Sequence, residues 1–243
     1  IMRCVNCPPS ATLLTSSLRS IGYSLGTAIA DIIDNSISAG AKKVEIRFTP
    51  ALDCLSIIDD GCGMTPEELR QAMRFGSKAP TEIRAEKDLG RYGLGLKTAS
   101  FSQCKVLTVI SKKHDHVSAY RWDLDNIENW NLIELNTTEI TKLPYFQNLS
   151  DRTHGTIVVW TNLDRLDGNK DAALQDAERH LSLVFHRYLE KELQIYWNGR
   201  ALKPNNPFQY VWDWKPKKTV WIGDAKVIVE ACQLKLPRTL SQK

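Results

Sequence analysis

Four short polar or glycine-rich segments, far apart along the chain, most constrain how this sequence can fold. The first, Asp31-Ile32-Ile33-Asp34-Asn35-Ser36, places a carboxylate and an amide one helical turn apart. The second, Asp59–Met64, sets an acid at the head of a two-glycine loop. Gly90–Lys97 and Gly155–Thr156 follow later in the chain. The order of the four segments predicts one pocket that they build together.

Residues 13–38 have a helical pattern with a polar stripe. When Asp31 is set at zero and each residue advances by about 100°, five other polar residues fall within about 60° of it. We expect the opposite, apolar side to face the core, and Gly40 to end the helix. The stripe comprises Ser24, Thr27, Asp34, Asn35 and Ser38, and the apolar side comprises Leu25, Ile29, Ile32 and Ile33.

Alternating and apolar runs predict the strands. Residues 44–48 alternate as a half-buried strand does, and residues 55–58 resemble its hairpin neighbour, which delivers Asp59 at the strand end. A short helix is expected to begin at Pro66, with Thr65 as its N-cap. Residues 74–95 have little periodicity and predict a mobile loop. Further strands are expected at 105–111, 117–124, 156–160, 194–197, 220–222 and 227–236, and a second long helix at 171–189.

This order of elements predicts an α+β fold, a two-layer α/β sandwich with a mixed, mostly antiparallel sheet and helices on one face. We expect residues 1–196 to form one domain. A proline-rich break at 203–207 precedes the last strands, so residues 197–243 are expected to begin a second α/β domain that is truncated here.

Composition excludes several classes of protein. Of the 243 residues, 42% are hydrophobic and 25% are charged, which is ordinary for a soluble globular protein. No apolar run approaches about 18 residues, so we expect no membrane-spanning helix, and the N-terminus lacks the layout of a signal peptide. The six scattered cysteines predict reduced thiols in the cytoplasm, or in the nucleus of a eukaryote. Cys4 and Cys7 alone do not complete a zinc site.

The net charge of +4 is unevenly distributed. Residues 215–243 hold seven basic and two acidic residues, a charge of +5, so the first 214 residues carry about −1. Such a tail suits nucleic acid, although a solvated edge is the commoner reason for one.

Asp31 and Asn35 lie four residues apart, so both project from one face of the helix. An amide oxygen is a neutral, hard ligand that suits a Mg²⁺ ion bridging phosphates, which makes Asn35 the candidate metal ligand. A carboxylate one turn earlier can orient a water or accept its proton, which makes Asp31 the candidate catalytic residue. Together they predict the splitting of a phosphoanhydride by water.

The second segment predicts a binding site for a base. Asp59 at a strand end can accept a hydrogen bond from an exocyclic amine such as that of adenine. Gly61 and Gly63 allow the backbone to approach the ligand closely. Thr156 offers a hydroxyl that faces the site from a strand.

The third segment predicts a binding site for phosphates. Its glycines permit successive main-chain N–H groups to wrap an anion, helped if residues 95–101 start a helix. Lys78 and Lys97 would add mobile positive charge. Neither a GxxxxGK[ST] loop nor a GxGxxG opening a βαβ unit occurs in the sequence, so the two commonest nucleotide motifs do not apply.

Taken together, the segments resemble those of the GHKL ATPases, the group of gyrase B, a heat-shock chaperone, histidine kinases and MutL. Asp31–Ala39 matches the N-box, and the other segments match the three glycine boxes. Phe75-Gly76-Ser77-Lys78 before the third segment is most similar to the MORC branch and its bacterial relatives. The resemblance covers about residues 15–195 and implies a fold of the Bergerat type. It implies nucleotide contacts from Asn35, Ala39, Asp59, Gly61, Gly63, Met64, Ser77, Lys78, Gly90, Arg91, Tyr92, Gly93, Leu94, Gly95, Leu96, Lys97 and Thr156, and a lid at 74–96.

The resemblance also implies a function. ATP and Mg²⁺ would be the cofactors, and the protein would form a homodimer when ATP is bound and open on hydrolysis. DNA, and a nuclease or another defence protein, would be its partners, with no role for a membrane. The family's usual base at the position of Asp31 is Glu, and a carboxylate retracted by roughly an ångström can slow a reaction about a hundredfold. Many relatives also take a lysine for the γ-phosphate from a following domain, so we expect slow hydrolysis.

Other functions remain open at this point. Asp31 in place of Glu is also compatible with a regulatory module that binds ATP without hydrolysing it. A chaperone-like ATPase is a further alternative, although no exposed apolar stretch marks a surface for a client protein. A histidine kinase is disfavoured because His180 and His186 belong to a helix after the pocket, not to a dimerisation helix beside an acid.

Overall fold

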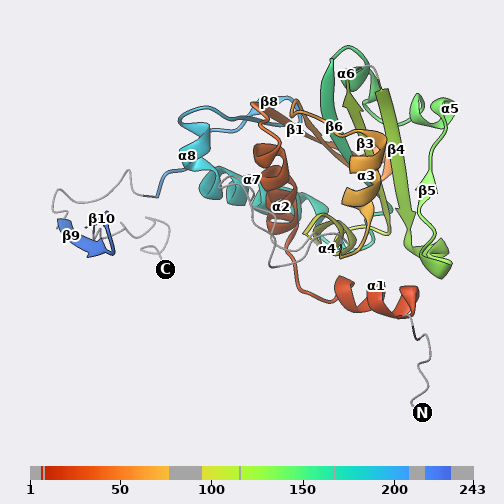
Figure 1. Ribbon diagram of the computed structural model, residues 1–243, viewed down its shortest axis with the longest axis horizontal. Helices are drawn as coiled ribbons and strands as arrows, with labels where there is room; N and C mark the ends of the chain where they lie inside the picture. Colours follow the sequence, from red (N-terminus) through yellow and green to blue (C-terminus); the bar gives the residue numbers. More distant parts are fainter. Residues whose placement is uncertain are drawn as a thin grey trace.

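The computed structural model describes residue 7 and residues 9–76, 95–114, 116–166, 168–207 and 217–230 (Figure 1). In this part of the chain the main sheet has eight strands, in the order β5-β4-β3-β6-β2-β1-β7-β8. Every neighbouring pair is antiparallel except β1 and β7, so the predicted mixed, mostly antiparallel sheet is confirmed. The strands are β1 (Lys43–Thr49), β2 (Cys54–Asp59), β3 (Val106–Lys113), β4 (His116–Asp123), β5 (Ile133–Glu134), β6 (His154–Thr161), β7 (Gln194–Trp197) and β8 (Arg200–Ala201).

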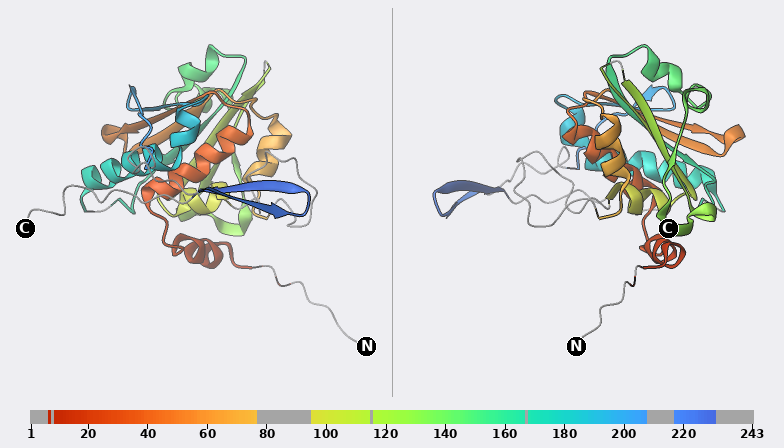
Figure 2. Two further views of the ribbon diagram at one scale, coloured as in Figure 1. Left: turned by 90° about the vertical axis from the view of Figure 1, so that its left-hand side faces the viewer. Right: turned by 45° about the vertical axis from the view of Figure 1, so that its right-hand side comes forward.

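Helices of very different lengths surround this sheet. The longest two, α2 and α7, pack against each other, and α2 also packs against α4. Figure 2 shows α2 (orange-red) and α7 (teal) lying over the strands in its left-hand view. The helices are α1 (Ala11–Arg19), α2 (Leu25–Ser38), α3 (Pro66–Met73), α4 (Gly95–Phe101), α5 (Thr137–Ile140), α6 (Phe146–Ser150), α7 (Lys170–Val184) and α8 (His186–Leu189), with 3₁₀ turns at Pro50–Leu52, Leu124–Asn126 and Glu128–Trp130.

The main core lies between the sheet and the layer of α2, α4 and α7. Ile29 and Ile33 of α2 are fully buried there, as their place on the apolar side of the helix predicts. They belong to the same cluster as Ile57 of β2 and Trp160 of β6. Burying side chains of this size stabilises the fold by about 1.5–3 kcal/mol each, so this layer fixes where the polar side of α2 must point.

The opposite face of the sheet is also partly covered, which the sequence analysis did not predict. Ile58, Ile110 and Ile157 form a second buried cluster with Ile140 of α5 and Leu149 of α6. The central strands carry apolar side chains on both faces, so the second face also needs a cover. The prediction of helices on one face is therefore correct for the long helices α2 and α7. The short helices α5 and α6 lie on the other face of the sheet.

Two predicted helices are interrupted. The pattern at residues 13–38 forms two helices, because Gly22 adopts a φ of +61° and Ser24 caps α2 by accepting from the N–H of Thr27. The helix expected at 171–189 breaks at Phe185 into α7 and α8. The N-cap at Thr65 is confirmed, and Glu68 completes a capping box there.

The strands near the end of the chain fall into two groups. β8 pairs with β7 and therefore extends the main sheet. β9 (Lys217–Ile222) and β10 (Ala225–Glu230) form an antiparallel hairpin of their own. The second domain stays a prediction. Among the described residues, no helix has the length and apolar character that crossing a membrane requires.

Candidate functional site

A row of polar side chains crosses one end of the main sheet on the face that carries α2. Asp59 of β2 is paired in register with Thr156 of β6, which is paired with Ser111 of β3. All three residues are buried. The hydroxyl groups of Ser111 and Thr156 lie 2.9 Å apart. The second and fourth sequence segments therefore meet side by side, as their order predicted.

Asp59 is held by donors from two directions. Its Oδ2 accepts a hydrogen bond from the hydroxyl of Ser36 at 2.9 Å, and its Oδ1 accepts one from the N–H of Gly61 at 2.9 Å. Burial raises the pKa of Asp59 to about 6, although the N–H of Gly61 and the hydroxyl of Ser36 favour the charged form. The carboxylate is therefore ionised and accepts hydrogen bonds at neutral pH. Because its pKa is only slightly below neutral, mild acidification protonates it.

Three glycines allow the segments around Asp59 to pack closely. A Cβ at Gly61 would lie 2.8 Å from the Cβ of Ala39, at the end of α2. At Gly63, where φ is +66°, it would lie 1.9 Å from the carbonyl oxygen of Lys112. At Gly155 it would lie 2.6 Å from the carbonyl oxygen of Asp59. The sequence predicts that Gly61 and Gly63 let a ligand approach closely, whereas the contacts that require glycine in the structure are with the protein's own backbone and with Ala39.

Further side chains, not among the predicted site residues, connect this loop to the sheet. Ser111 accepts from the N–H of Met64 at 2.9 Å. Nδ1 of His154 lies 2.7 Å from the carbonyl oxygen of Gly61, within hydrogen-bonding distance. Ser36 lies in the first segment and could have been found from its sequence position. Ser111 could not, because only the strand register places it beside Thr156.

The polar side of α2 carries the second half of the site. Asp31 is partly buried, and its Oδ2 accepts a hydrogen bond from the hydroxyl of Tyr23 at 2.9 Å. Burial, and then the charge of Asp31, raise the pKa of the neighbouring Asp34 to about 6. Asn35 is exposed, and within the described part of the chain its side chain makes no hydrogen bond. Its amide oxygen is therefore available to a ligand.

A metal would have to find most of its ligands outside these residues. Among the described residues, no group of three or more His, Cys, Asp or Glu side chains is placed to hold an ion. A site with so few protein ligands fits Mg²⁺, which usually binds through one or two protein groups, phosphates and waters. The exposed amide of Asn35 fits such a role.

Lys97 differs from its predicted environment. The sequence predicts a mobile positive charge here, but the side chain is buried and its Nζ donates to the carbonyl oxygen of Ala72 at 2.7 Å. Burial lowers the pKa of Lys97 to about 8. The residue lies in α4, which begins at Gly95, and its side chain reaches the last turn of α3.

Part of the predicted phosphate-binding segment cannot be compared with the structure. Of the third segment, Gly95, Leu96 and Lys97 are described, and of the loop before it, residues 74–76. Ser77, Lys78, Gly90, Arg91, Tyr92, Gly93 and Leu94, most of the predicted lid, lie outside the described residues.

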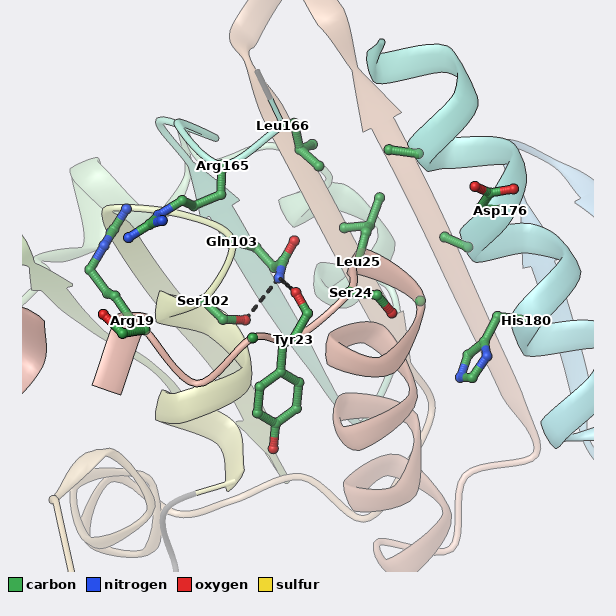
Figure 3. A pocket seen from close by; sticks show the side chains of 15 residues that line it. Arg19, Tyr23, Ser24, Leu25, Ser102, Gln103, Arg165, Leu166, Asp176 and His180 are labelled. Atoms are coloured by element: carbon green, nitrogen blue, oxygen red, sulfur yellow. Dashed lines mark hydrogen bonds between the residues drawn. The ribbon is translucent and has the colours of Figure 1, made fainter. Parts of the chain in front are cut away.

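A cleft of about 600 Å³ opens at the N-terminal end of α2, away from the row on the sheet. Figure 3 shows Ser24 before α2, Leu25 of α2, Gln103 after α4, and Asp176 and His180 of α7 around it. None of the residues predicted for the nucleotide site lines this cleft. Tyr23 connects the two regions, because its carbonyl oxygen accepts from Nε2 of Gln103 at 3.2 Å while its hydroxyl bonds to Asp31.

A family of known proteins matches this region. The family described as "Histidine kinase-, DNA gyrase B-, and HSP90-like ATPase" matches residues 23–156. That range contains all four segments, from Tyr23 before α2 to Thr156 in β6.

Individual relatives are similar over shorter stretches. ATPase morc-1 from Caenorhabditis elegans is 35% identical over 95 residues, which is 38% of this chain and 11% of that protein. The DNA mismatch repair protein MutL from Rhizorhabdus wittichii is 36% identical over 74 residues, which is 29% of this chain and 12% of that protein. The chain therefore spans about a tenth of the length of these relatives. The solved ATPase and transducer domains of DNA topoisomerase II from Balamuthia mandrillaris align with a TM-score of 0.48 at 18% identity, over 74% of this chain and 48% of that one.

Proposed function

This chain belongs to the family of histidine kinase-, DNA gyrase B- and HSP90-like ATPases, and we propose that it binds ATP with Mg²⁺ and hydrolyses it slowly. The observation that carries the proposal is the buried Asp59 carboxylate, held by Ser36 and Gly61 beside Thr156. A carboxylate in a site of low dielectric accepts strongly from an exocyclic amine, and adenine carries such an amine.

The polar side of α2 supports the hydrolytic half of the proposal. Asn35 would hold Mg²⁺ through its exposed amide oxygen. When bound, the ion would neutralise charge on the phosphates. Asp31 lies one turn earlier, with Oδ2 bonded to Tyr23, and its other oxygen would orient the attacking water or accept its proton.

Nucleotide binding and turnover test these roles directly. Calorimetry with Mg²⁺ and ATP should detect binding to the wild type, and the variant Asp59→Asn should bind at least about tenfold more weakly, because an amide presents one acceptor and one donor group where the carboxylate presents acceptors alone. Asp31→Ala should bind ATP but lose turnover, and Asn35→Ala should lose the dependence of binding on Mg²⁺. If both variants turn ATP over at the wild-type rate, Asp31 and Asn35 do not have the roles proposed for them.

Beyond the pocket, we propose that the full-length protein is a dimeric clamp that closes when ATP binds and acts on DNA, as part of a DNA-related or defence process. The support is the resemblance to the MORC branch, the name of the relative MutL, which is a DNA mismatch repair protein, and the basic residues after 214. Filter binding to DNA and sedimentation, each with and without a non-hydrolysable ATP analogue, test this. The analogue should raise both dimerisation and DNA retention, and no effect on either would argue against a clamp.

One observation favours a second function, that of a regulatory module that binds ATP without turning it over. Asp31 is one methylene shorter than the usual Glu, and Tyr23 already occupies one of its carboxylate oxygens. In that case the wild type would bind ATP, and its turnover would equal that of Asp31→Ala. A measured difference between the two would exclude this alternative.

A further inference from the structure

Ser111 joins three parts of the candidate base site through one buried hydroxyl. It accepts from the N–H of Met64 at 2.9 Å, it lies 3.2 Å from the carbonyl oxygen of Gly155, and it lies 2.9 Å from the hydroxyl of Thr156. Its side chain has no exposed surface. Water therefore does not compete for these contacts.

The number of donors and acceptors limits how these bonds can be arranged. A serine hydroxyl has one proton to donate and two lone pairs that accept. The carbonyl of Gly155 can only accept, so it takes the proton of Ser111. The N–H of Met64 can only donate, so it uses one lone pair. The second lone pair is left for Thr156, and every contact is satisfied only if the hydroxyl of Thr156 donates to Ser111.

This arrangement fixes what Thr156 presents to a ligand. With its proton directed to Ser111, the Thr156 hydroxyl has only lone pairs left for the pocket. The neighbouring Asp59 carboxylate also only accepts, from Ser36 and Gly61. The buried end of the site is therefore composed of acceptors, and it complements a donor such as an amino group.

We propose that Ser111 is a specificity-determining residue which, by orienting the proton of Thr156, makes the pocket select a 6-aminopurine nucleotide over a 6-oxopurine nucleotide. The inference rests on the proposed function, because it requires a purine nucleotide at Asp59. A 6-oxo group would place a third acceptor against Thr156 and Asp59, and buried acceptors facing each other are costly. Ser111 does this without touching the nucleotide.

The test compares ATP with inosine triphosphate, which differs from ATP by an oxygen at position 6 and a proton at N1. Affinities of both are measured by calorimetry with Mg²⁺ for the wild type and Ser111→Ala. In the variant, Thr156 can turn its proton toward the 6-oxygen. The ratio of ATP affinity to inosine triphosphate affinity should therefore fall at least about tenfold, chiefly because inosine triphosphate binds better. Ser111→Cys keeps the shape of the side chain, with a slightly larger atom that is a much weaker acceptor, and it gives the same comparison if the alanine variant does not fold.

Ser118 provides a matched control. It is paired in register with Ser111 on the next strand, it is buried, and its Oγ has no hydrogen-bond partner among the described residues. Ser118→Ala should leave the affinity ratio unchanged. If Ser111→Ala or Ser111→Cys weakens both nucleotides equally and keeps the wild-type ratio, Ser111 is only structural and the inference is wrong. A wild type that binds neither nucleotide would instead remove the proposed function.

Discussion

The hydroxyl of Tyr23 donates a hydrogen bond to Oδ2 of Asp31 over 2.9 Å, from the loop before α2 to the second turn of that helix. Burial, followed by this hydrogen bond, raises the pKa of Tyr23, so the phenol stays protonated and remains a donor throughout the neutral range. One oxygen of the candidate catalytic carboxylate is thereby held in place, and the other is left for a water.

Replacing Tyr23 with Phe should slow turnover without weakening ATP binding. A hydrogen bond to a charged group contributes about 1.5–3 kcal/mol when buried, and less at this partly exposed position, so we expect kcat to fall about tenfold and KM to stay within about twofold. Steady-state kinetics measure both. Tyr145→Phe is the control, because that hydroxyl bonds to Thr49 and its residue packs against the cluster on the other face of the sheet. An unchanged kcat in Tyr23→Phe would show that Asp31 does not need this contact.

Replacing Asp31 with Glu should speed turnover. The longer side chain extends the carboxylate by roughly an ångström, and a misplacement of that size can account for about a hundredfold in rate. We therefore expect kcat to rise between about tenfold and a hundredfold, with ATP affinity unchanged. If Asp31→Glu is no faster than wild type in a phosphate-release assay, side-chain length is not the reason for slow hydrolysis.

ATP affinity should depend on pH through Asp59, whose pKa is raised to about 6 by burial. Below this value the carboxyl is protonated and no longer accepts from an amine as an anion. Calorimetry at pH 5 should therefore give an affinity about tenfold lower than at pH 7.5. Asp59→Asn should bind weakly at both values and lose most of this dependence. If the wild-type affinity for ATP is the same at pH 5 and pH 7.5, the charge of Asp59 does not contribute to nucleotide binding.

The carboxyl groups of Asp34 and Asp59 should affect the pH dependence of stability in the direction opposite to that of an ordinary salt-bridged acid. The pKa of both Asp34 and Asp59 is raised to about 6, so the folded protein binds their protons more tightly than the unfolded chain does. Their contribution is fully present below about pH 4 and is lost as pH rises through about 6. In urea titrations at pH 5 and 7.5, the double variant Asp34→Asn/Asp59→Asn should lose less unfolding free energy between the two values than wild type. An equal loss would mean that other groups control the pH dependence.

Much of the site could be predicted because its residues follow local rules. Asp59 ends a strand that alternation identifies, and Thr65 caps α3 with Glu68 in a pattern visible in the sequence. The break before α2 was missed because the helical period continues across residues 20–24, and a single left-handed Gly22 overrides it. The environments of Lys97 and Ser111 depend on contacts with residues 25 and 47 positions away, which a linear pattern does not contain.

The close approach at Gly63 gives a prediction that is independent of any ligand. A Cβ there would lie 1.9 Å from the carbonyl oxygen of Lys112, and φ is +66°. At Gly40, φ is +76° but a Cβ would meet nothing within 4 Å. Gly40→Ala should therefore cost only the left-handed backbone penalty of about 1–2 kcal/mol, whereas Gly63→Ala must also displace a strand and should cost at least about 3 kcal/mol. Urea denaturation of both variants measures this. Equal losses of unfolding free energy would mean that the loop from Asp59 to Met64 can move away from β3, and that Gly63 is needed for its φ alone.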